Sequence, residues 1–261
     1  MAIIKASIIK MMRTRMKDLF SEQSAHYAKA RPMYSEEIMA QILLSVPERD
    51  LAWDVGAGSG QFTHLLAEQF THVLATDISQ NQLQHAPELK NVRYAIQSAT
   101  HSGLMAHVVD LVTVAQAIHW FDFESFYKEV RRVLKPEGIL AVIGYGLIQI
   151  HDEDLNQQVQ HLYQHTLKGY WAPERRYIDE NYQSIPFPFQ DVATPPLELN
   201  YIWTPEQLFE YLTTWSAVQD YERKTGHSAL TQIAEALQQH KDSSVSVTFP
   251  VLLRIGQLAN P

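Results

Sequence analysis

The sequence predicts an α/β protein with a mostly parallel β-sheet that helices cover on both faces. From residue 51 onward, short apolar runs alternate with helical patterns, and each run is apolar on both faces of the strand it would form. Strands of this kind belong to parallel sheets that are buried between helices. Hydrophobic residues make up 46 % and charged residues 19 % of the 261-residue chain, which excludes a disordered chain.

The alternating part of the chain is assigned element by element. Strands are expected at Leu51–Val55, His72–Asp77, Val92–Ile96, Val108–Ala115 and Ile139–Tyr145. Helices are expected at Gln61–Phe70, Gln80–Ala86 and Phe123–Leu134. In the last of these helices, Phe126, Val130 and Val133 are spaced to lie on one buried face.

The last third of the chain has a different character. We expect helices at His151–Tyr170, Thr204–Trp215 and Ser228–Gln239, and strands at Leu197–Trp203 and Val245–Ile255. Because no crossover helix follows the final strand, it is expected to pair antiparallel with residues 197–203 at an edge. The complete prediction is a seven-stranded sheet with an antiparallel last strand and a C-terminal helical and aromatic lid, including a lid insertion at about 150–196.

Composition and charge limit the partners that the protein could bind. The chain has 21 lysines and arginines against 29 aspartates and glutamates, and its net charge of −8 disfavours bulk binding of nucleic acid. It has no cysteine, which excludes disulfides, thiolate catalysis and zinc–thiolate sites, and we predict no metal site. No apolar run approaches the roughly 18 residues that span a bilayer. We therefore expect a cytoplasmic monomer or homodimer without a membrane partner.

Residues 1–19 form a basic segment ahead of a domain that is expected to span residues 20–261. Lysines and arginines alternate there with isoleucines and methionines. Since chain termini are usually poorly ordered, we expect a poorly ordered tail. An amphipathic arm that touches a membrane or nucleic acid is the alternative.

The most informative stretch is the loop that follows the first strand. Gly56, Gly58 and Gly60 open the next helix, and glycines there allow a positive φ and close approach of the backbone to a ligand. The loop lies at the carboxyl end of a strand, where open α/β sheets bind ligands. Asp54 precedes the glycines, and its charge would repel a pyrophosphate but suit an ammonium or a sulfonium. S-adenosylmethionine carries both of these cations and no phosphate.

A second carboxylate supports the same ligand. Asp77 ends the second strand, where it can accept hydrogen bonds from the hydroxyls of a ribose. The glycine spacing, Gly-x-Gly-x-Gly, also differs from the Gly-x-Gly-x-x-Gly of dinucleotide-binding folds. Together the two acids and the glycine loop favour S-adenosylmethionine over a nicotinamide dinucleotide.

With these residues in place, the chain resembles the class I S-adenosylmethionine-dependent methyltransferases over about residues 20–258. It is most similar to the small-molecule branch that includes trans-aconitate methyltransferase. Besides the glycine loop, the matching stretches are Tyr27–Tyr34, Asp77–Ala86, Ala115–Asp122, Arg132–Gly138 and Thr214–Tyr221. The resemblance implies a Rossmann-like fold and methyl transfer.

The resemblance also implies a cofactor site. Its members would be Tyr27, Arg31, Asp54, Gly56, Ala57, Gly58, Gly60, Asp77, Ile78, Gln82, Ser98, Ala99, Ala115 and Gln116. In this arrangement Asp54 and the loop backbone would hold the methionine end, and Asp77 the ribose. The adenine would lie between Ile78 and Gln82, with its edge on the backbone of residues 98–99. The chain departs from the family pattern at Thr100, where an acid is frequent.

Four residues are candidates for the acceptor side. His119 and Trp120 follow the fourth strand at the ligand-binding edge, where His119 could act as a general base, bind an anion or only line the pocket. Arg175 lies in the aromatic segment and could clamp a carboxylate. Tyr145 ends the fifth strand at the same edge.

The sequence thus favours transfer of a methyl group to an oxygen of a small molecule, a carboxylate among the candidates. Two alternatives stay open. The first is methylation of RNA or of a carrier-bound acyl group, with the basic tail as a docking arm. The second is a non-enzymatic regulator that binds the cofactor as a signal.

Overall fold

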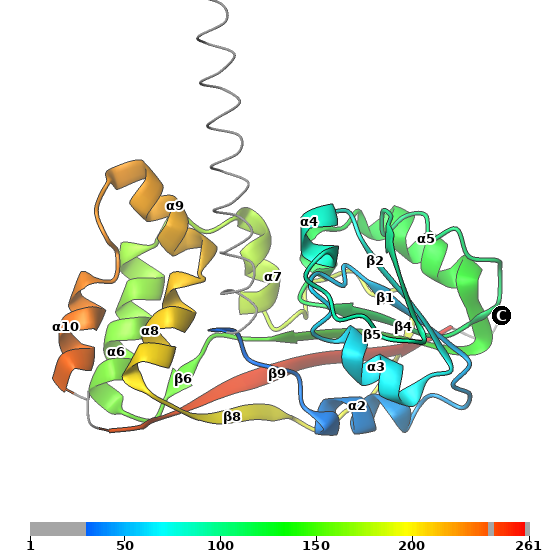
Figure 1. Cartoon of the computed structure of the whole chain (residues 1–261), viewed down its shortest axis with the longest axis horizontal. Helices are drawn as coiled ribbons and strands as arrows, with labels where there is room; N and C mark the ends of the chain where they lie inside the picture. The colour runs from blue at the N-terminus through cyan, green and yellow to red at the C-terminus, as the bar shows by residue number, and fades with distance from the viewer. Residues whose placement is uncertain (1–29, 240–242, 259–261) are drawn as a thin grey trace, which may run out of the picture.

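The computed structural model describes residues 30–239 and 243–258. Figure 1 shows a sheet flanked by helices at one end of the molecule, a group of helices at the other, and a long strand, β9, that runs from one to the other. The basic tail predicted at residues 1–19 and the predicted site residue Tyr27 lie outside the described residues. The end of the predicted domain beyond Leu258 lies outside them as well.

The described residues form a nine-stranded sheet in the order β3-β2-β1-β4-β5-β9-β6, with β7 and β8 also paired to β9. The strands are β1 Leu51–Val55, β2 His72–Asp77, β3 Val92–Ile96, β4 Val109–Ala115, β5 Leu134–Tyr145, β6 Gln149–Ile150, β7 Gln190–Val192, β8 Glu198–Trp203 and β9 Val245–Gln257. The strands β1 to β5 pair in parallel, and β9 pairs antiparallel with β5. The predicted Rossmann-like, mostly parallel sheet with an antiparallel last strand is therefore confirmed.

The last strand differs from the prediction in its place and length. β9 has 13 residues and is long enough for its two halves to pair with different strands. Residues 251–257 pair with β5, and residues 245–250 pair antiparallel with β8, as expected. The short strands β6 and β7 also pair with β9. The sheet consequently has nine strands rather than seven, and β9 lies inside it rather than at its edge.

The fifth strand begins earlier than predicted, at Leu134 rather than Ile139. An ion pair with a buried carboxylate favours this early start, because the Lys135 ammonium lies 2.7 Å from a carboxylate oxygen of Asp110 on β4. The other oxygen of Asp110 accepts the backbone N–H groups of Asp50 and Leu51, each at 2.9 Å. These bonds fix the starts of β1, β4 and β5 against one another.

The α-helices are α2 Glu36–Leu43, α3 Thr63–Gln69, α4 Gln80–Leu83, α5 Phe123–Val133, α6 Glu153–His161, α7 Arg176–Asp179, α8 Pro205–Thr213, α9 Ser216–Thr225 and α10 Thr231–Gln239. The sequence did not predict α2 or α9. The predicted helix His151–Tyr170 ends at His161 and continues as a π-helical turn, Leu162–Thr166. Among the described residues, no helix is long and apolar enough to cross a membrane.

The part of the predicted lid insertion that is rich in proline and aromatic residues, Trp171–Pro196, contains short elements. A 3₁₀ turn at Pro173–Arg175 leads into α7, and β7 follows. In Figure 1, α7 lies between the sheet and the group of helices that contains α6, α8, α9 and α10. This segment therefore reaches the ligand-binding edge of the sheet from the side of the helices.

Two hydrophobic cores lie on the two faces of the sheet. One contains Ile139 and Ile143 of β5 together with the buried faces of the C-terminal helices, among them Leu155 of α6. Trp203 and Trp215 belong to this core and are 8 % and 4 % exposed, as expected for packing residues. Because this core is continuous, the C-terminal helices pack as one body with the sheet.

Candidate functional site

The glycine loop adopts the conformation that its glycines predict. Gly56, Gly58 and Gly60 have φ values of +68°, +57° and +79°, which side-chain-bearing residues rarely adopt. The backbone N–H groups of Gly56 and Ala57 donate to the Thr76 carbonyl at 2.8 and 3.0 Å, which ties the loop to β2. A Cβ atom on Gly56 would lie 2.6 Å from the Ala117 methyl group, so this position has no room for a side chain.

The space above Gly58 suits a ligand. Among the described residues outside its chain neighbours, the nearest atom to a Cβ added there is Gln82 Oε1 at 3.9 Å. Gln82 and Ile78 follow β2 on this side, and Ile78 is 78 % exposed. The loop backbone is therefore open beside the two residues that the resemblance assigns to the adenine.

Asp77 links the glycine loop to the turn that follows β2. One carboxylate oxygen accepts the Gly58 N–H at 2.9 Å, and the other accepts the Ser79 N–H at 2.8 Å. Each carboxylate oxygen can accept a further hydrogen bond, and the side chain is only partly buried. Asp77 is thus oriented by two backbone donors and keeps capacity for the hydroxyls of a ribose.

Asp54 lies beneath the loop and is fully buried. Its two oxygens accept the Thr63 hydroxyl at 2.6 Å and the Thr113 hydroxyl at 2.8 Å. Burial raises the pKa of Asp54 to about 6, although both threonine bonds favour the ionised form and lower it. The carboxylate is therefore held between α3 and β4, and its contact with the methionine end of a cofactor stays a prediction.

The residues after β3 lie beside Asp77. The Gln97 N–H donates to the Asp77 carbonyl at 3.1 Å, which brings the loop of Ser98 and Ala99 to the same edge. The Ser98 carbonyl accepts the His101 N–H at 3.1 Å, and Ser98 Oγ lies 3.0 Å from the Thr100 hydroxyl. The backbone of residues 98–99 thus lies near Asp77, and its contact with an adenine stays a prediction.

Both the nitrogen and the oxygen of the Gln116 side-chain amide form hydrogen bonds within the fold. It has a φ of +53° directly after Ala115 at the end of β4. Its amide nitrogen donates to the Tyr145 carbonyl at 3.1 Å, and its amide oxygen accepts the Tyr182 hydroxyl at 3.2 Å. Gln116 therefore joins β4, β5 and the segment after α7, and its predicted place near the ammonium is untested.

His119 lies in a 3₁₀ turn after β4 and is only 9 % exposed. Its Nδ1 has no hydrogen-bond partner among the described residues. Burial, together with the positive charges of Arg175 and Arg31, lowers the pKa of His119 to about 4. The imidazole is therefore neutral at physiological pH, which disfavours the anion-binding role of an imidazolium.

Two arginines from distant parts of the chain face His119. Arg31 donates to the Thr214 carbonyl at 3.4 Å. Arg175 Nε donates to the Tyr163 hydroxyl at 2.9 Å and lies 3.3 Å from Asp179. Its guanidinium also lies over the Trp171 ring, 5.1 Å from the centroid. Arg175 is thus held in place by aromatic contacts and one carboxylate, and its side chain is 23 % exposed.

Buried tyrosines surround these cations. The pKa values of Tyr182 and Tyr211 are raised by burial, and the charge of Tyr145 raises both of them further while that of Arg175 opposes the shift. Contacts show that these residues lie close together, because Gln116 bonds both the Tyr145 carbonyl and the Tyr182 hydroxyl, and Tyr145 and Tyr211 both pack against the Phe249 ring. We call the group the cationic cluster, and its members are Arg31, His119, Tyr145, Arg175, Tyr182 and Tyr211.

The sequence analysis named His119, Tyr145 and Arg175 for the acceptor side and assigned Arg31 to the cofactor, and it did not name Tyr182 or Tyr211. Tyr182 is fully buried and follows Asn181, and both have a positive φ. Its ring lies against Gly144, where an added Cβ would be 2.6 Å from the Tyr182 hydroxyl. Gly144 was the signal available in the sequence. A glycine within an apolar strand often marks the close approach of another group, although it does not tell which group approaches.

Trp120 stands beside the cluster and is 62 % exposed. It lines a cleft of about 520 Å³ that also contains His119 and Tyr177. The predicted substrate residues therefore occupy two adjoining places, with Arg175 and Tyr145 in the cluster and Trp120 in the cleft.

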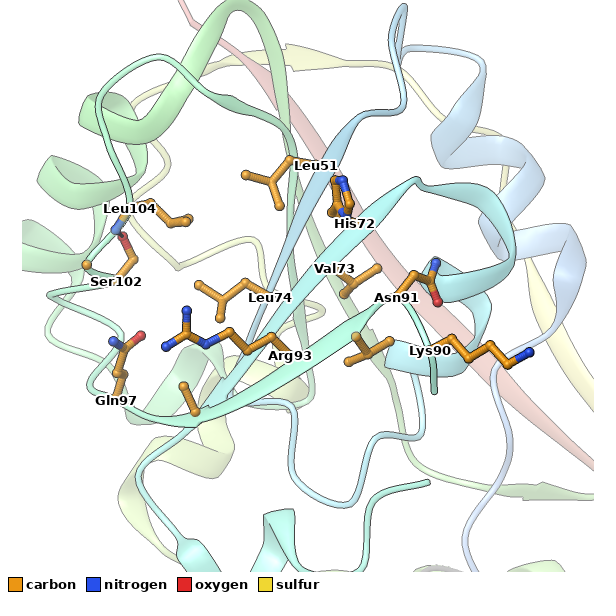
Figure 2. A pocket seen from close by; sticks show the side chains of 13 residues that line it. Leu51, His72, Val73, Leu74, Lys90, Asn91, Arg93, Gln97, Ser102 and Leu104 are labelled. Atoms are coloured by element: carbon orange, nitrogen blue, oxygen red, sulfur yellow. Dashed lines mark hydrogen bonds between the residues drawn. The ribbon is translucent and has the colours of Figure 1, made fainter. Parts of the chain in front are cut away.

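A separate groove of about 430 Å³ lies on one face of the sheet. Figure 2 shows its lining, with Leu51 and Leu74 on the sheet and Leu104 on the facing loop. The groove extends from His72 and Lys90, at the starts of β2 and β3, to Gln97 just after the end of β3. None of the predicted site residues lines it, so we treat it as separate from the candidate site.

Comparison with known proteins identifies the family. A family model described as a methyltransferase domain matches residues 53–142. A methyltransferase of Dictyostelium discoideum is 35 % identical over 253 residues, which cover 94 % of this chain and 96 % of that protein. The chain belongs to the class I S-adenosylmethionine-dependent methyltransferases.

A solved structure supports the assignment along most of the chain. A type II methyltransferase from Anaeromyxobacter dehalogenans matches with a TM-score of 0.82 and 37 % identity, covering 88 % of this chain and 99 % of that one. A Saccharomyces cerevisiae protein named as an S-adenosylmethionine-dependent methyltransferase is 26 % identical over 62 % of this chain and 58 % of its own length. The narrower resemblance to the trans-aconitate branch stays a prediction.

S-adenosylmethionine is the cofactor of this family, and the residues present fit it. The glycine loop leaves room above Gly58, and Asp77 keeps acceptor capacity at the end of β2. Within the described part of the chain, no group of three or more histidine, aspartate or glutamate side chains is arranged to hold a metal ion.

Proposed function

We propose that this methyltransferase transfers the methyl group of S-adenosylmethionine to a carboxylate oxygen of a small molecule. The cationic cluster is the observation that carries the proposal. Arg31 donates to the Thr214 carbonyl, and Arg175 lies over the Tyr163 ring, which packs against Trp215, the residue after Thr214. The charges of both arginines also lower the pKa of the buried His119, so two positive charges lie near one place at the ligand-binding edge. A guanidinium matches the two oxygens of a carboxylate and forms strong charge-assisted hydrogen bonds with it.

In this proposal, named residues bind each part of the cofactor. Asp77 binds the ribose, Gly56 and Gly58 hold the methionine end, and Ile78 and Gln82 flank the adenine. Asp54 lies below the loop and supplies negative charge toward the ammonium and the sulfonium. The support is the conformation of the loop and the orientation of Asp77 by two backbone donors.

The residues of the cluster orient the acceptor. When bound, the cofactor supplies an electrophilic methyl group: a carboxylate oxygen forms the new C–O bond as the C–S bond breaks, and that bonding pair stays on sulfur. The acceptor is already ionised, so no side chain has to remove a proton. Neutral His119 is therefore a hydrogen-bonding residue in this proposal rather than a general base, and Arg31 and Arg175 fix the attack geometry.

The test compares two arginine variants. Arg175→Met removes a charge from the cluster, whereas Arg223→Met removes one from the surface of α9, where the side chain is 75 % exposed. We expect Arg175→Met to raise KM for a carboxylic acid at least tenfold, as for a lost charge-assisted bond of about 1.5–3 kcal/mol. The dissociation constant of the cofactor is expected to change little in either variant.

Methyl transfer to an alcohol or amine but not to its matched carboxylic acid would overturn the proposal. An equal KM in Arg175→Met and Arg223→Met would also overturn it. Arg175→Lys separates charge from geometry, because lysine keeps the charge but loses the planar fork. Its KM is expected to lie between those of the parent and Arg175→Met.

A further inference from the structure

The cleft beside the cationic cluster has aromatic walls. One part of its lining comes from residues that follow β4, namely His119, Trp120 and Phe123, and the other part from Pro173, Arg176 and Tyr177 around α7. Its volume of about 520 Å³ is comparable to that of pockets that hold small organic ligands, about 300–1,000 Å³. The cleft is thus large enough for a molecule or for a substantial part of one.

The aromatic rings of the two parts of the lining are held in place. The Phe123 ring packs edge-on against Tyr177 with the centroids 5.4 Å apart. Arg176 lies over the Tyr177 ring, 4.6 Å from the centroid, and donates to its hydroxyl at 2.9 Å. Trp120 alone among the rings of this cleft is a large hydrophobic side chain left mostly exposed. Fixed rings around an exposed indole are typical of a surface that contacts an apolar ligand.

His119 joins the cleft to the cluster. It lines the cleft, its ring centroid lies 5.0 Å from that of Trp120, and the charges of Arg175 and Arg31 also act on it. Its side chain is more than nine-tenths buried, and Nδ1 lacks a partner among the described residues. A buried nitrogen without a partner is unfavourable, so a ligand that reaches from the cleft to the cluster would satisfy it.

The charges of the cleft do not favour a second anionic group. Arg176 is paired with the Tyr177 ring, and Glu174 contributes an opposing negative charge to the same part of the lining. The cleft therefore offers aromatic surface, while the cluster offers the cations.

We propose that the cleft binds an apolar arm of the acceptor, which makes the acceptor a carboxylic acid with an aromatic or long aliphatic arm. This inference rests on the proposed methylation of a carboxylate in the cluster. The carboxylate lies by Arg31 and Arg175, a polar atom near it bonds His119 Nδ1, and the arm lies between Trp120 and Tyr177.

The test measures kcat/KM for a series of acids of increasing arm length, from acetate through butanoate and hexanoate to octanoate, with 3-phenylpropanoate and a tricarboxylate alongside. Each fully buried methylene is expected to raise kcat/KM about fourfold. We therefore expect octanoate and 3-phenylpropanoate to exceed both acetate and the tricarboxylate by tenfold or more.

Variants of Trp120 test whether the dependence of kcat/KM on arm length arises in the cleft. Trp120→Ala is expected to lower the octanoate-to-acetate ratio of kcat/KM at least fivefold, and Trp120→Phe to keep most of the ratio. Ile202→Ala is the matched control, because Ile202 is an exposed hydrophobic residue on β8, 77 % exposed and outside the cleft. It is expected to leave the ratio unchanged.

The two proposals fail in different ways. Methylation of acids with no dependence on arm length, or with the tricarboxylate as the best acceptor, would overturn the apolar-arm inference and leave the proposed function standing. The same holds if Trp120→Ala and Ile202→Ala give equal ratios. If no acid is methylated while another acceptor class is, the proposed function fails and this inference falls with it.

Discussion

At the scale of single residues, Asp54 shows how burial alters a side chain that the sequence singles out. The sequence predicts an acid that contacts a cationic ligand. The structure adds that the carboxylate is fully buried and already accepts two threonine hydroxyls. Its raised pKa of about 6 means that the fold holds the ionised carboxylate at a cost before any cation joins it.

This cost gives a dependence of stability on pH. The folded pKa lies above the ordinary value of 3.8, so the stabilising contribution of Asp54 is fully present below that value and is lost as pH rises through about 6. Asp54→Asn keeps the shape and removes the titration. At each pH we compare the unfolding free energy of the parent with that of Asp54→Asn. As the pH rises from about 5 to 7.5, the value of the parent is expected to fall by about 1 kcal/mol more than that of the variant.

Urea unfolding of the cofactor-free protein at the two pH values measures this difference directly. Thr113→Val and Thr63→Val serve as controls, because each removes one hydroxyl partner but keeps the titrating group. A constant difference between the parent and Asp54→Asn would show that Asp54 does not titrate in this range.

At the scale of elements, the sequence predicted the parallel strands well, whereas it predicted the start of β5 and the C-terminal helices less well. β1, β2 and β3 begin and end at the predicted residues, because strands buried on both faces are apolar along their whole length. The early start of β5 was not predictable, since it depends on Lys135 meeting Asp110 from another strand. α9 was missed because Ser216–Thr225 buries only Ala217 and Val218, which leaves little apolar periodicity.

The contact between β5 and the segment after α7 was also beyond the sequence. Gly144 accommodates the ring of Tyr182, a residue distant in the chain, and no local pattern relates the two. Its tight contact gives a prediction about the packing of these elements. In Gly144→Ala the new methyl group would lie 2.6 Å from the Tyr182 hydroxyl.

We expect Gly144→Ala to lower the unfolding free energy by about 1–3 kcal/mol, the usual cost of overpacking a core. Chemical denaturation of the parent and the variant measures it. Adding Tyr182→Phe, which removes the hydroxyl oxygen, should recover part of the loss. Gly169→Ala is a control, because within the described part of the chain, its two neighbours aside, no atom lies within 4 Å of a Cβ added there, although its φ of +86° adds some strain. An unchanged stability in Gly144→Ala would contradict the described contact.

At the scale of the whole molecule, the site is assembled from segments that lie far apart in the sequence. The sequence predicted the fold and the cofactor edge, since the glycine loop and the acid after β2 belong to one local unit. It named Arg31 and Arg175 singly, but their common effect on His119 depends on how residues 30–35 and the 3₁₀ turn before α7 reach the sheet. The acceptor side therefore needed the structure, because it has no local motif.

We propose above that this methyltransferase esterifies a carboxylate. The sharpest test is to supply S-adenosylmethionine labelled with ¹³C in its methyl group together with octanoate, and to locate the label by NMR. We expect a single new resonance of a methyl ester, which Arg175→Met reduces and Arg223→Met does not. A label found on nitrogen or carbon of an alternative acceptor, with no ester from any acid supplied, would contradict it.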